Sequence, residues 1–291
     1  MPRPCAPSTD VSLRHRPGHP YLAGAPLLVA HRGGSKLAPE NTLSAFRQAG
    51  DAWHADVLEM DVHLSADGEV VVIHDGTVDR TTDGVGAVRE LPWNALREFD
   101  AGYRFVASDG SAPFRGSGVG IPRFEEVLET FPRMRLNVES KAPEAAGPLV
   151  ELIRRHGATH RVLIAAERER NRAAARGHRP WGASRWQVAV LRYVPFMYTP
   201  VVDVVQVPER YRGLRVVTPA FIAAAHRRNL PVQVWTVDRT ADMLRLLDWG
   251  VDGIQTDRPD LLAAVLSQVA GRPAAPGPAA TAEPIVVGPD A

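Results

Sequence analysis

Short runs of Val, Ile and Leu alternate with helical patterns along most of this 291-residue chain, and that alternation narrows the possible folds. The runs show no polar alternation, as expected of strands that are buried on both faces. Strands that alternate with helices form βα units around a parallel sheet. Eight such units in about 240 residues are typical of an α/β fold, the (β/α)8 TIM barrel. The expected strands are 27–31, 57–62, 135–140, 162–165, 182–185, 203–207, 232–236 and 253–256.

Several of the intervening segments have the spacing of an amphipathic helix. In the first of them, Leu43, Phe46 and Ala49 fall on one stripe. Proline near the first turn of several others suits the start of a helix. Asn41 or Thr42 can cap the first helix. The expected helices are 42–53, 122–131, 219–228, 240–249 and 259–269.

A hairpin, rather than a helix, follows the second expected strand. Asp67 and Gly68 separate two apolar runs, which is a strong short-range hairpin signal. If these two are the central turn residues, His74 lies directly opposite Asp61. Glu59 then shares a face with Asp61, because strand side chains alternate with a period of two. The pairing would bring two carboxylates and an imidazole together.

The hairpin leads into a long connection at about 76–121, which contains several glycines. A connection of this length in a compact domain is usually functional or mobile. We therefore expect a small insertion after the second strand of the barrel.

Both ends of the chain are rich in proline, alanine and glycine, which predicts disordered tails at 1–25 and 270–291 around one domain at 26–269. Residues 1–20 lack the apolar core of a secretory signal. No run approaches the roughly 18 apolar residues of a transmembrane segment. Cys5 is the single cysteine, so no disulfide framework exists. These features favour a cytoplasmic location.

The overall charge gives no indication of a macromolecular partner. Formal net charge is +1, so no global field favours nucleic acid or membrane.

Three carboxylates are expected at one end of the barrel. Active residues in such barrels lie at the carboxyl ends of strands, where Glu59, Asp61 and Glu139 occur. Three unpaired carboxylates would repel one another and raise their pKa values. A divalent cation relieves this repulsion, and oxygen ligands suit Mg²⁺ or Ca²⁺. The alternative is that each carboxylate pairs with a nearby Arg or Lys.

Two histidines are expected at the same mouth, His31 after the first strand and His74 in the hairpin. Histidine suits general acid–base chemistry because its pKa lies near neutrality. One base and one acid are what a displacement at phosphorus requires. A structural role is the alternative for each.

Cations and an aromatic ring complete the candidate site. Arg32 can bind a phosphate through two hydrogen bonds, and Lys141 can act as a point charge. Alternatively, both merely neutralise the carboxylates. Gly33 and Gly34 would let a ligand approach the backbone. Trp235 is either an apolar wall for a substrate or a core residue.

Several motifs occur in order over roughly 27–264, and together they resemble a known family. The first half carries His31-Arg32-Gly33, Pro39-Glu40-Asn41-Thr42, Glu59-x-Asp61, and Asp67-Gly68 leading to His74-Asp75. The second half carries Asn137-Val138-Glu139-Ser140-Lys141, Val234-Trp235-Thr236-Val237-Asp238, and Gly250 to Pro259. This set closely resembles the glycerophosphodiester phosphodiesterase family. Ser140 and Asp238 depart from its usual residues.

The resemblance implies a TIM-barrel catalytic domain with a substrate-selecting insertion. It implies metal-dependent hydrolysis of glycerophosphodiesters to glycerol 3-phosphate and an alcohol. Its site residues would be the acid–base pair His31 and His74, the metal ligands Glu59, Asp61 and Glu139, and the phosphate contacts Arg32 and Lys141. One alternative is a lysophospholipase D, or a lyase that stops at a cyclic phosphate, acting on lysolipids. Another is a non-catalytic barrel that binds phosphate.

Overall fold

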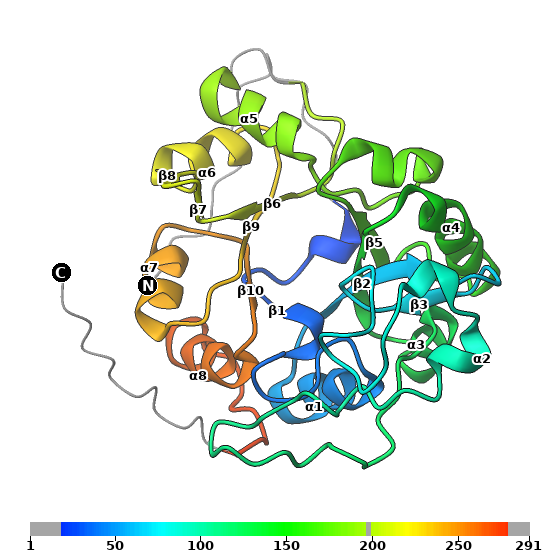
Figure 1. The fold of residues 1–291 in the computed structure, drawn as a ribbon. Coiled ribbons are helices and arrows are strands. Elements are labelled where there is room, and N and C mark those ends of the chain that lie inside the picture. Colours follow the sequence, from blue (N-terminus) through cyan, green and yellow to red (C-terminus); the bar gives the residue numbers. More distant parts are fainter. Residues whose placement is uncertain (1–18, 196–198, 279–291) are drawn as a thin grey trace.

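Parallel strands curl into a ring with helices around the outside (Figure 1). This computed structural model describes residues 19–195 and 199–278. The strand order in the sheet is β5-β4-β2-β1-β10-β9-β6, and every neighbouring pair is parallel. The strands are β1 (Leu27–Ala30), β2 (Val57–Leu64), β4 (Arg135–Ser140), β5 (Val162–Ala165), β6 (Val205–Pro208), β9 (Val232–Trp235) and β10 (Gly253–Thr256).

Two isolated parallel bridges close the ring between β5 and β6. Ile164 pairs with Trp181, and Gly182 pairs with Val204. The fifth expected strand, at 182–185, is therefore reduced to a short bridging segment, because Ser184 already caps the helix that follows. The predicted α/β barrel is confirmed.

The helices cover the outer face of the strands (Figure 1). In β2, Leu58, Met60 and Val62 join the outer apolar core with Phe46 and Phe124 of the helices. The alternate positions of β2 therefore face the barrel interior. The helices are α1 (Leu43–Trp53), α2 (Trp93–Leu96), α3 (Phe124–Thr130), α4 (Ala146–Arg155), α5 (Arg185–Tyr193), α6 (Pro219–His226), α7 (Thr240–Asp248) and α8 (Pro259–Ala270). Short 3-10 helices are η1 (Pro20–Leu22), η2 (His31–Gly33), η3 (Val88–Glu90), η4 (Pro143–Ala145) and η5 (Glu169–Ala175).

An apolar cluster that includes η1 fills the amino-terminal end of the barrel. Tyr21 and Leu22 are buried against Leu27, Val57 and other strand residues. The Tyr21 hydroxyl donates a hydrogen bond to the Leu136 carbonyl at 3.1 Å. Packing thus begins before the expected boundary at 26, since buried apolar residues occur within the Pro-rich segment.

The two expected tails lie mostly outside the described residues, which omit 1–18 and 279–291. The part of the C-terminal tail that is described packs on the barrel. The Gly277 amide donates to the Ala52 carbonyl at 2.8 Å.

The hairpin differs from the prediction by one residue. Strand β3 (Val70–Val72) pairs with β2 so that Leu64 lies opposite Val70. Residues 66–68 form a three-residue loop, with Gly68 at a φ of 88°. The expected pairing of Asp61 with His74 is therefore wrong. The Ile73 amide instead donates to the Asp61 carbonyl at 2.9 Å.

Residues 76–121 form a small unit beside β3. Its apolar side chains form a separate cluster with Val71 and Ile73 of the hairpin arm. This cluster includes Val78, Val88 and Leu96. No helix in the described ranges is long and apolar enough to cross a membrane.

Candidate active site

A cavity of about 490 Å³ opens at the carboxyl ends of the strands. All but one of the site residues expected from the sequence line this cavity, and the exception, Asp61, lies buried beside them. The polar side is lined by His31, Arg32, Glu59, His74, Glu139 and Lys141. The apolar side includes Val188, Tyr193, Leu214, Val216 and Trp235.

The three carboxylates converge as predicted. Glu59 and Asp61 project from β2, and Glu139 of β4 lies directly beside Asp61 in the sheet register. Their nearest oxygens all lie within 4.8 Å of one another. Glu59 is 3 % exposed and Asp61 is 1 % exposed. Two carboxylates are thus almost fully removed from water, where their charge must be compensated by neighbouring groups.

Two cations compensate part of this charge. Lys141 Nζ lies 3.0 Å from Asp61 Oδ1 and 2.8 Å from Glu139 Oε2. Arg32 Nε lies 3.2 Å from Asp61 Oδ2. Burial alone would raise the pKa of Asp61, but Lys141 and Arg32 outweigh it and hold that pKa below its usual range. The predicted pairing of carboxylates with cations thus exists for Asp61 and Glu139.

Among the residues that the structure describes, no Lys or Arg side chain forms an ion pair with Glu59. Its Oε2 accepts a hydrogen bond from the Arg32 amide at 2.9 Å, and His31 Nε2 lies 4.0 Å away. Arg32 presents this amide from a left-handed conformation, with a φ of 50°. Burial and the charge of Asp61 raise the pKa of Glu59. A buried carboxylate short of positive charge, beside two others, is a donor set that fits a hard divalent cation.

A carboxylate orients each of the two histidines. His31 Nδ1 lies 2.6 Å from Asp257 Oδ1, and His74 Nδ1 lies 2.6 Å from Asp75 Oδ1. A carboxylate at Nδ1 fixes the ring and its tautomer, so Nε2 is the nitrogen left for a ligand. Burial disfavours the charged form of His31, but Asp257 and Glu59 outweigh it and raise its pKa. Both oriented rings line the cavity.

Asn41 is a site residue that the sequence did not reveal. Its amide Nδ2 donates to Asp61 Oδ2 at 3.0 Å, and its Oδ1 accepts from the Asp61 backbone amide at 3.2 Å. Its backbone has a φ of 59°, which Asn tolerates better than most residues. The helix cap is Thr42 instead, whose hydroxyl accepts from the Ala45 amide. An Asn beside a good cap residue carries no separate signal.

A chain of ion pairs connects the insertion with the site. Arg32 Nη1 donates to Glu40 Oε1 at 3.0 Å. Arg80, in the insertion, bonds both oxygens of Glu40 at 2.7 and 2.8 Å. Arg80 Nε also donates to Asp75 Oδ2 at 2.5 Å, and Asp75 holds His74. The insertion is thus bonded to groups that position both a cation and a histidine.

The two glycines after His31 have a packing role that differs from the expected one. A Cβ at Gly33 would lie 2.7 Å from Ala45 Cβ of α1, and one at Gly34 would lie 2.8 Å from Pro259 of α8. Both also have positive φ angles. Close contact with helices therefore explains these glycines. Trp235 ends β9, is 38 % exposed and lines the cavity, which excludes the core role.

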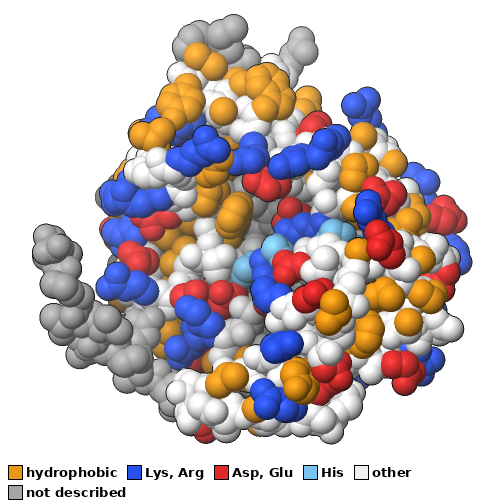
Figure 2. Space-filling model, in the orientation of Figure 1, with side chains coloured by type: hydrophobic (Ala, Val, Ile, Leu, Met, Phe, Trp, Pro, Cys, Tyr) orange, Lys and Arg blue, Asp and Glu red, His pale blue; other side chains and the backbone are white. Residues whose placement is uncertain are grey.

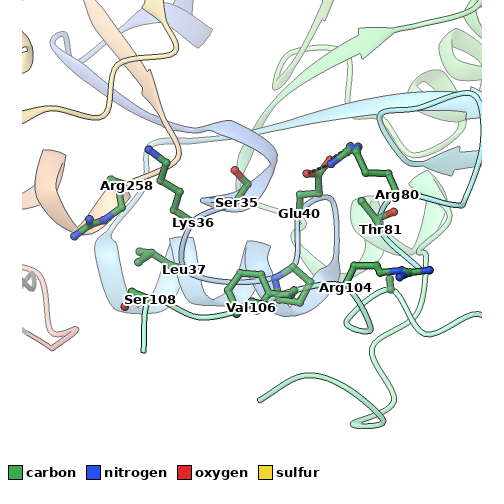
Figure 3. Close-up of a pocket in the computed structure, with 13 residues that line it drawn as sticks. Ser35, Lys36, Leu37, Glu40, Arg80, Thr81, Arg104, Val106, Ser108 and Arg258 are labelled. Atoms are coloured by element: carbon green, nitrogen blue, oxygen red, sulfur yellow. Dashed lines mark hydrogen bonds and ion pairs between the residues drawn. The ribbon is translucent and has the colours of Figure 1, made fainter. Parts of the chain in front are cut away.

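A second cavity, of about 530 Å³, lies on the other side of the Glu40–Arg80 pair. Figure 3 shows it between the loop that follows η2 and the insertion segment 104–108. Lys36 and Arg80 line this cavity. Lys36 forms an ion pair with Asp238, and Arg80 forms ion pairs with Glu40 and Asp75. It contains neither histidine of the candidate active site.

Comparisons with known proteins identify relatives that are similar to this chain in sequence and in fold. The family described as "Glycerophosphoryl diester phosphodiesterase family" matches residues 31–202 and 188–261. A "Probable glycerophosphodiester phosphodiesterase 2" of Mycobacterium tuberculosis is 34% identical over 256 residues, covering 84% of this chain and 91% of that protein. A "Glycerophosphodiester phosphodiesterase" of Caldanaerobacter subterraneus is 33% identical over 253 residues, covering 81% and 96%.

Solved structures are similar as well. A glycerophosphodiester phosphodiesterase from Agrobacterium tumefaciens has a TM-score of 0.66 at 28% identity, covering 82% of this chain and 99% of that one. A phosphodiesterase from Oleispira antarctica, solved with the product sn-glycerol-3-phosphate, has a TM-score of 0.67 at 24% identity, covering 84% and 97%.

Proposed function

The chain belongs to the glycerophosphoryl diester phosphodiesterase family, and from that membership we propose that it hydrolyses glycerophosphodiesters to glycerol 3-phosphate and an alcohol. The observation that carries the proposal is the pair of carboxylate-oriented histidines in one cavity with three carboxylates. Either histidine alone could be structural. Both lining the same cavity supports acid–base chemistry there.

Proton transfer by the two imidazoles accounts for the reaction. One histidine Nε2 takes the proton of the glycerol 2-hydroxyl as that oxygen bonds to phosphorus. The other, protonated, gives its proton to the leaving alcohol as the phosphorus–oxygen bond breaks. Water then opens the cyclic phosphate with the two roles reversed, which returns both histidines to their starting state.

The charged groups bind and orient the diester. Arg32 and Lys141 line the cavity and would contact the phosphate oxygens. Glu59, Asp61 and Glu139 would hold a divalent cation, and their oxygen ligands suit Mg²⁺ or Ca²⁺. The cation would act as a Lewis acid and stabilise the charge on the phosphate. Asp257 and Asp75 keep the imidazoles in the tautomer that presents Nε2.

Substitution of each histidine tests its role in proton transfer. His31→Ala and His74→Ala should each lower kcat for glycerol 3-phosphate release by roughly 10²–10⁴-fold. His160→Ala, an exposed histidine outside the cavity, is the matched control and should behave as wild type. Full activity in both site variants would rule out the two-histidine mechanism.

Removal of the metal gives a second prediction. EDTA should abolish glycerol 3-phosphate release, and titration with Mg²⁺, Ca²⁺ and Mn²⁺ should restore it and identify the preferred ion. Activity that survives exhaustive chelation would contradict a metal role for the three carboxylates. No release under any metal would contradict the enzyme assignment itself.

A lysolipid substrate is the second candidate, and the apolar side of the cavity favours it. Tyr193 and Leu214 line that side and are 65 % and 63 % exposed, so an acyl chain could cover them. Phosphorus NMR of products from glycerophosphocholine and from a lysophospholipid would separate the two substrates, and would detect a reaction that stops at the cyclic phosphate.

We propose a cytoplasmic location, which fractionation of cells would test.

A further inference from the structure

Helix α5 exposes two large aromatic side chains, one near each of its ends. Of its residues, Gln187 and Leu191 are buried. Trp186 is 67 % exposed and Tyr193 is 65 % exposed. They are seven residues apart, two helical turns, so both lie on one face. A helix of a globular domain normally turns such a face toward the core.

The hairpin of β7 (Arg210–Tyr211) and β8 (Leu214–Arg215) extends this apolar surface. Tyr211 is 40 % exposed and Leu214 is 63 % exposed. The hairpin is bonded to α5, because the Arg185 guanidinium donates to the Tyr211 hydroxyl and covers its ring at 4.8 Å. We call the surface of α5 and this hairpin the α5–hairpin patch.

Five arginines lie on the helix and hairpin that form the patch: Arg185, Arg192, Arg210, Arg212 and Arg215. Figure 2 shows Lys and Arg side chains in a row between the hydrophobic side chains over α5 and the mouth of the cavity. Arg185 forms an ion pair with Glu167, and Arg215 Nε lies 3.9 Å from Glu209 Oε1. The other three make no ion pair with a carboxylate among the described residues.

The patch is continuous with the active-site mouth. Tyr193, Tyr211 and Leu214 line the same cavity as His31 and His74. A surface that covers the patch would therefore lie at the entrance through which a substrate reaches the histidines.

We propose that the α5–hairpin patch docks on an anionic lipid surface. Exposed aromatic and aliphatic side chains together with arginines are the combination that binds the headgroup region of a membrane. Each arginine adds attraction to anionic lipids, roughly fivefold in binding. The net charge of +1 does not reveal this, because it averages the patch with acidic surfaces elsewhere. Docking would place the cavity where lipid-derived diesters are released.

The charge argues against a second copy of this chain as the occupant. In a two-fold symmetric contact the same patch lies on both partners. That arrangement would bring the arginines of the two copies against one another, with two glutamates on each to offset them. An anionic lipid surface has the opposite charge.

Vesicle binding tests the proposal without turnover, so its result is independent of the proposed catalysis. The full chain is sedimented with vesicles of phosphatidylcholine and phosphatidylglycerol in equal parts, and with vesicles of phosphatidylcholine alone. We expect binding to the anionic vesicles that weakens with salt. Trp186→Ser with Leu214→Ser should weaken it by about tenfold or more, and Arg212→Glu by roughly fivefold or more.

Matched controls lie in the insertion. Val85→Ser and Arg89→Glu replace side chains that are 77 % and 75 % exposed outside the patch, and should bind as wild type. Unchanged circular dichroism and melting temperature verify that each variant folds. No binding to anionic vesicles, or equal binding by patch and control variants, overturns the proposal. So does self-association that the double variant removes, because the patch would then join two copies.

Discussion

At the scale of single residues, the candidate site also depends on side chains that do not line the cavity. Asn41 bonds the carboxylate and the backbone amide of Asp61, so it sets the direction in which that carboxylate points. It is 3 % exposed, and water cannot readily replace it. When a residue that hydrogen-bonds a metal ligand is replaced, metal affinity or activity usually falls by about 10–100-fold.

Asn41→Ala should therefore affect both the site and stability. We expect the divalent cation concentration for half-maximal activity to rise by about 10–100-fold. The free energy of unfolding in EDTA should fall by about 1–3 kcal/mol, because Asp61 loses buried hydrogen-bond partners. Asn94→Ala, at an exposed position of α2, is the control for both measurements. An unchanged cation requirement would mean that Asn41 does not orient Asp61.

At the scale of elements, Arg80 bonds the insertion to Asp75 and Glu40 beside the candidate active site. Removing its guanidinium frees Asp75 and Glu40, which in turn hold His74 and Arg32. Arg80→Ala should lower kcat by roughly 10–100-fold with a smaller change in KM. Added guanidinium should restore part of the loss, since Arg80 is 48% exposed. Arg89→Ala in the same insertion should have no effect, and a loss that guanidinium cannot restore would indicate a merely structural role.

Elements differ in how far the sequence could predict them. A strand buried on both faces needs an apolar run, so β1 and β5 were predictable from their apolar sequences. The hairpin register was not, because it depends on the turn. Gly68 takes the third position of a three-residue loop, while Asp67 bonds the Ser65 hydroxyl and the Trp93 amide instead of occupying a two-residue turn.

The same contrast holds for the site. His31, Glu59 and Glu139 followed from the rule that active residues lie at carboxyl ends of strands. Asn41 and Asp75 could not be assigned in this way, because each acts through a neighbour that only the folded backbone brings within reach.

At the scale of the whole molecule, stability depends on ties between the helical layer and the barrel. His226 at the end of α6 lies 2.7 Å from Asp252 Oδ2, which also accepts from the Val232 amide at the start of β9. The hydrogen bond to Asp252 raises the pKa of His226 against the effect of burial. This pair lies outside the active-site cavity.

The raised pKa predicts a pH dependence of unfolding. A group whose pKa is higher in the folded state stabilises the fold fully below its unfolded value of about 6.5, and this contribution is lost as pH rises through the folded pKa. His226→Gln should therefore cost about 1 kcal/mol at pH 5.5 and less above pH 8. Urea unfolding of wild type and variant across this range measures the difference. A difference that grows with pH would mean that His226 is neutral in the folded protein.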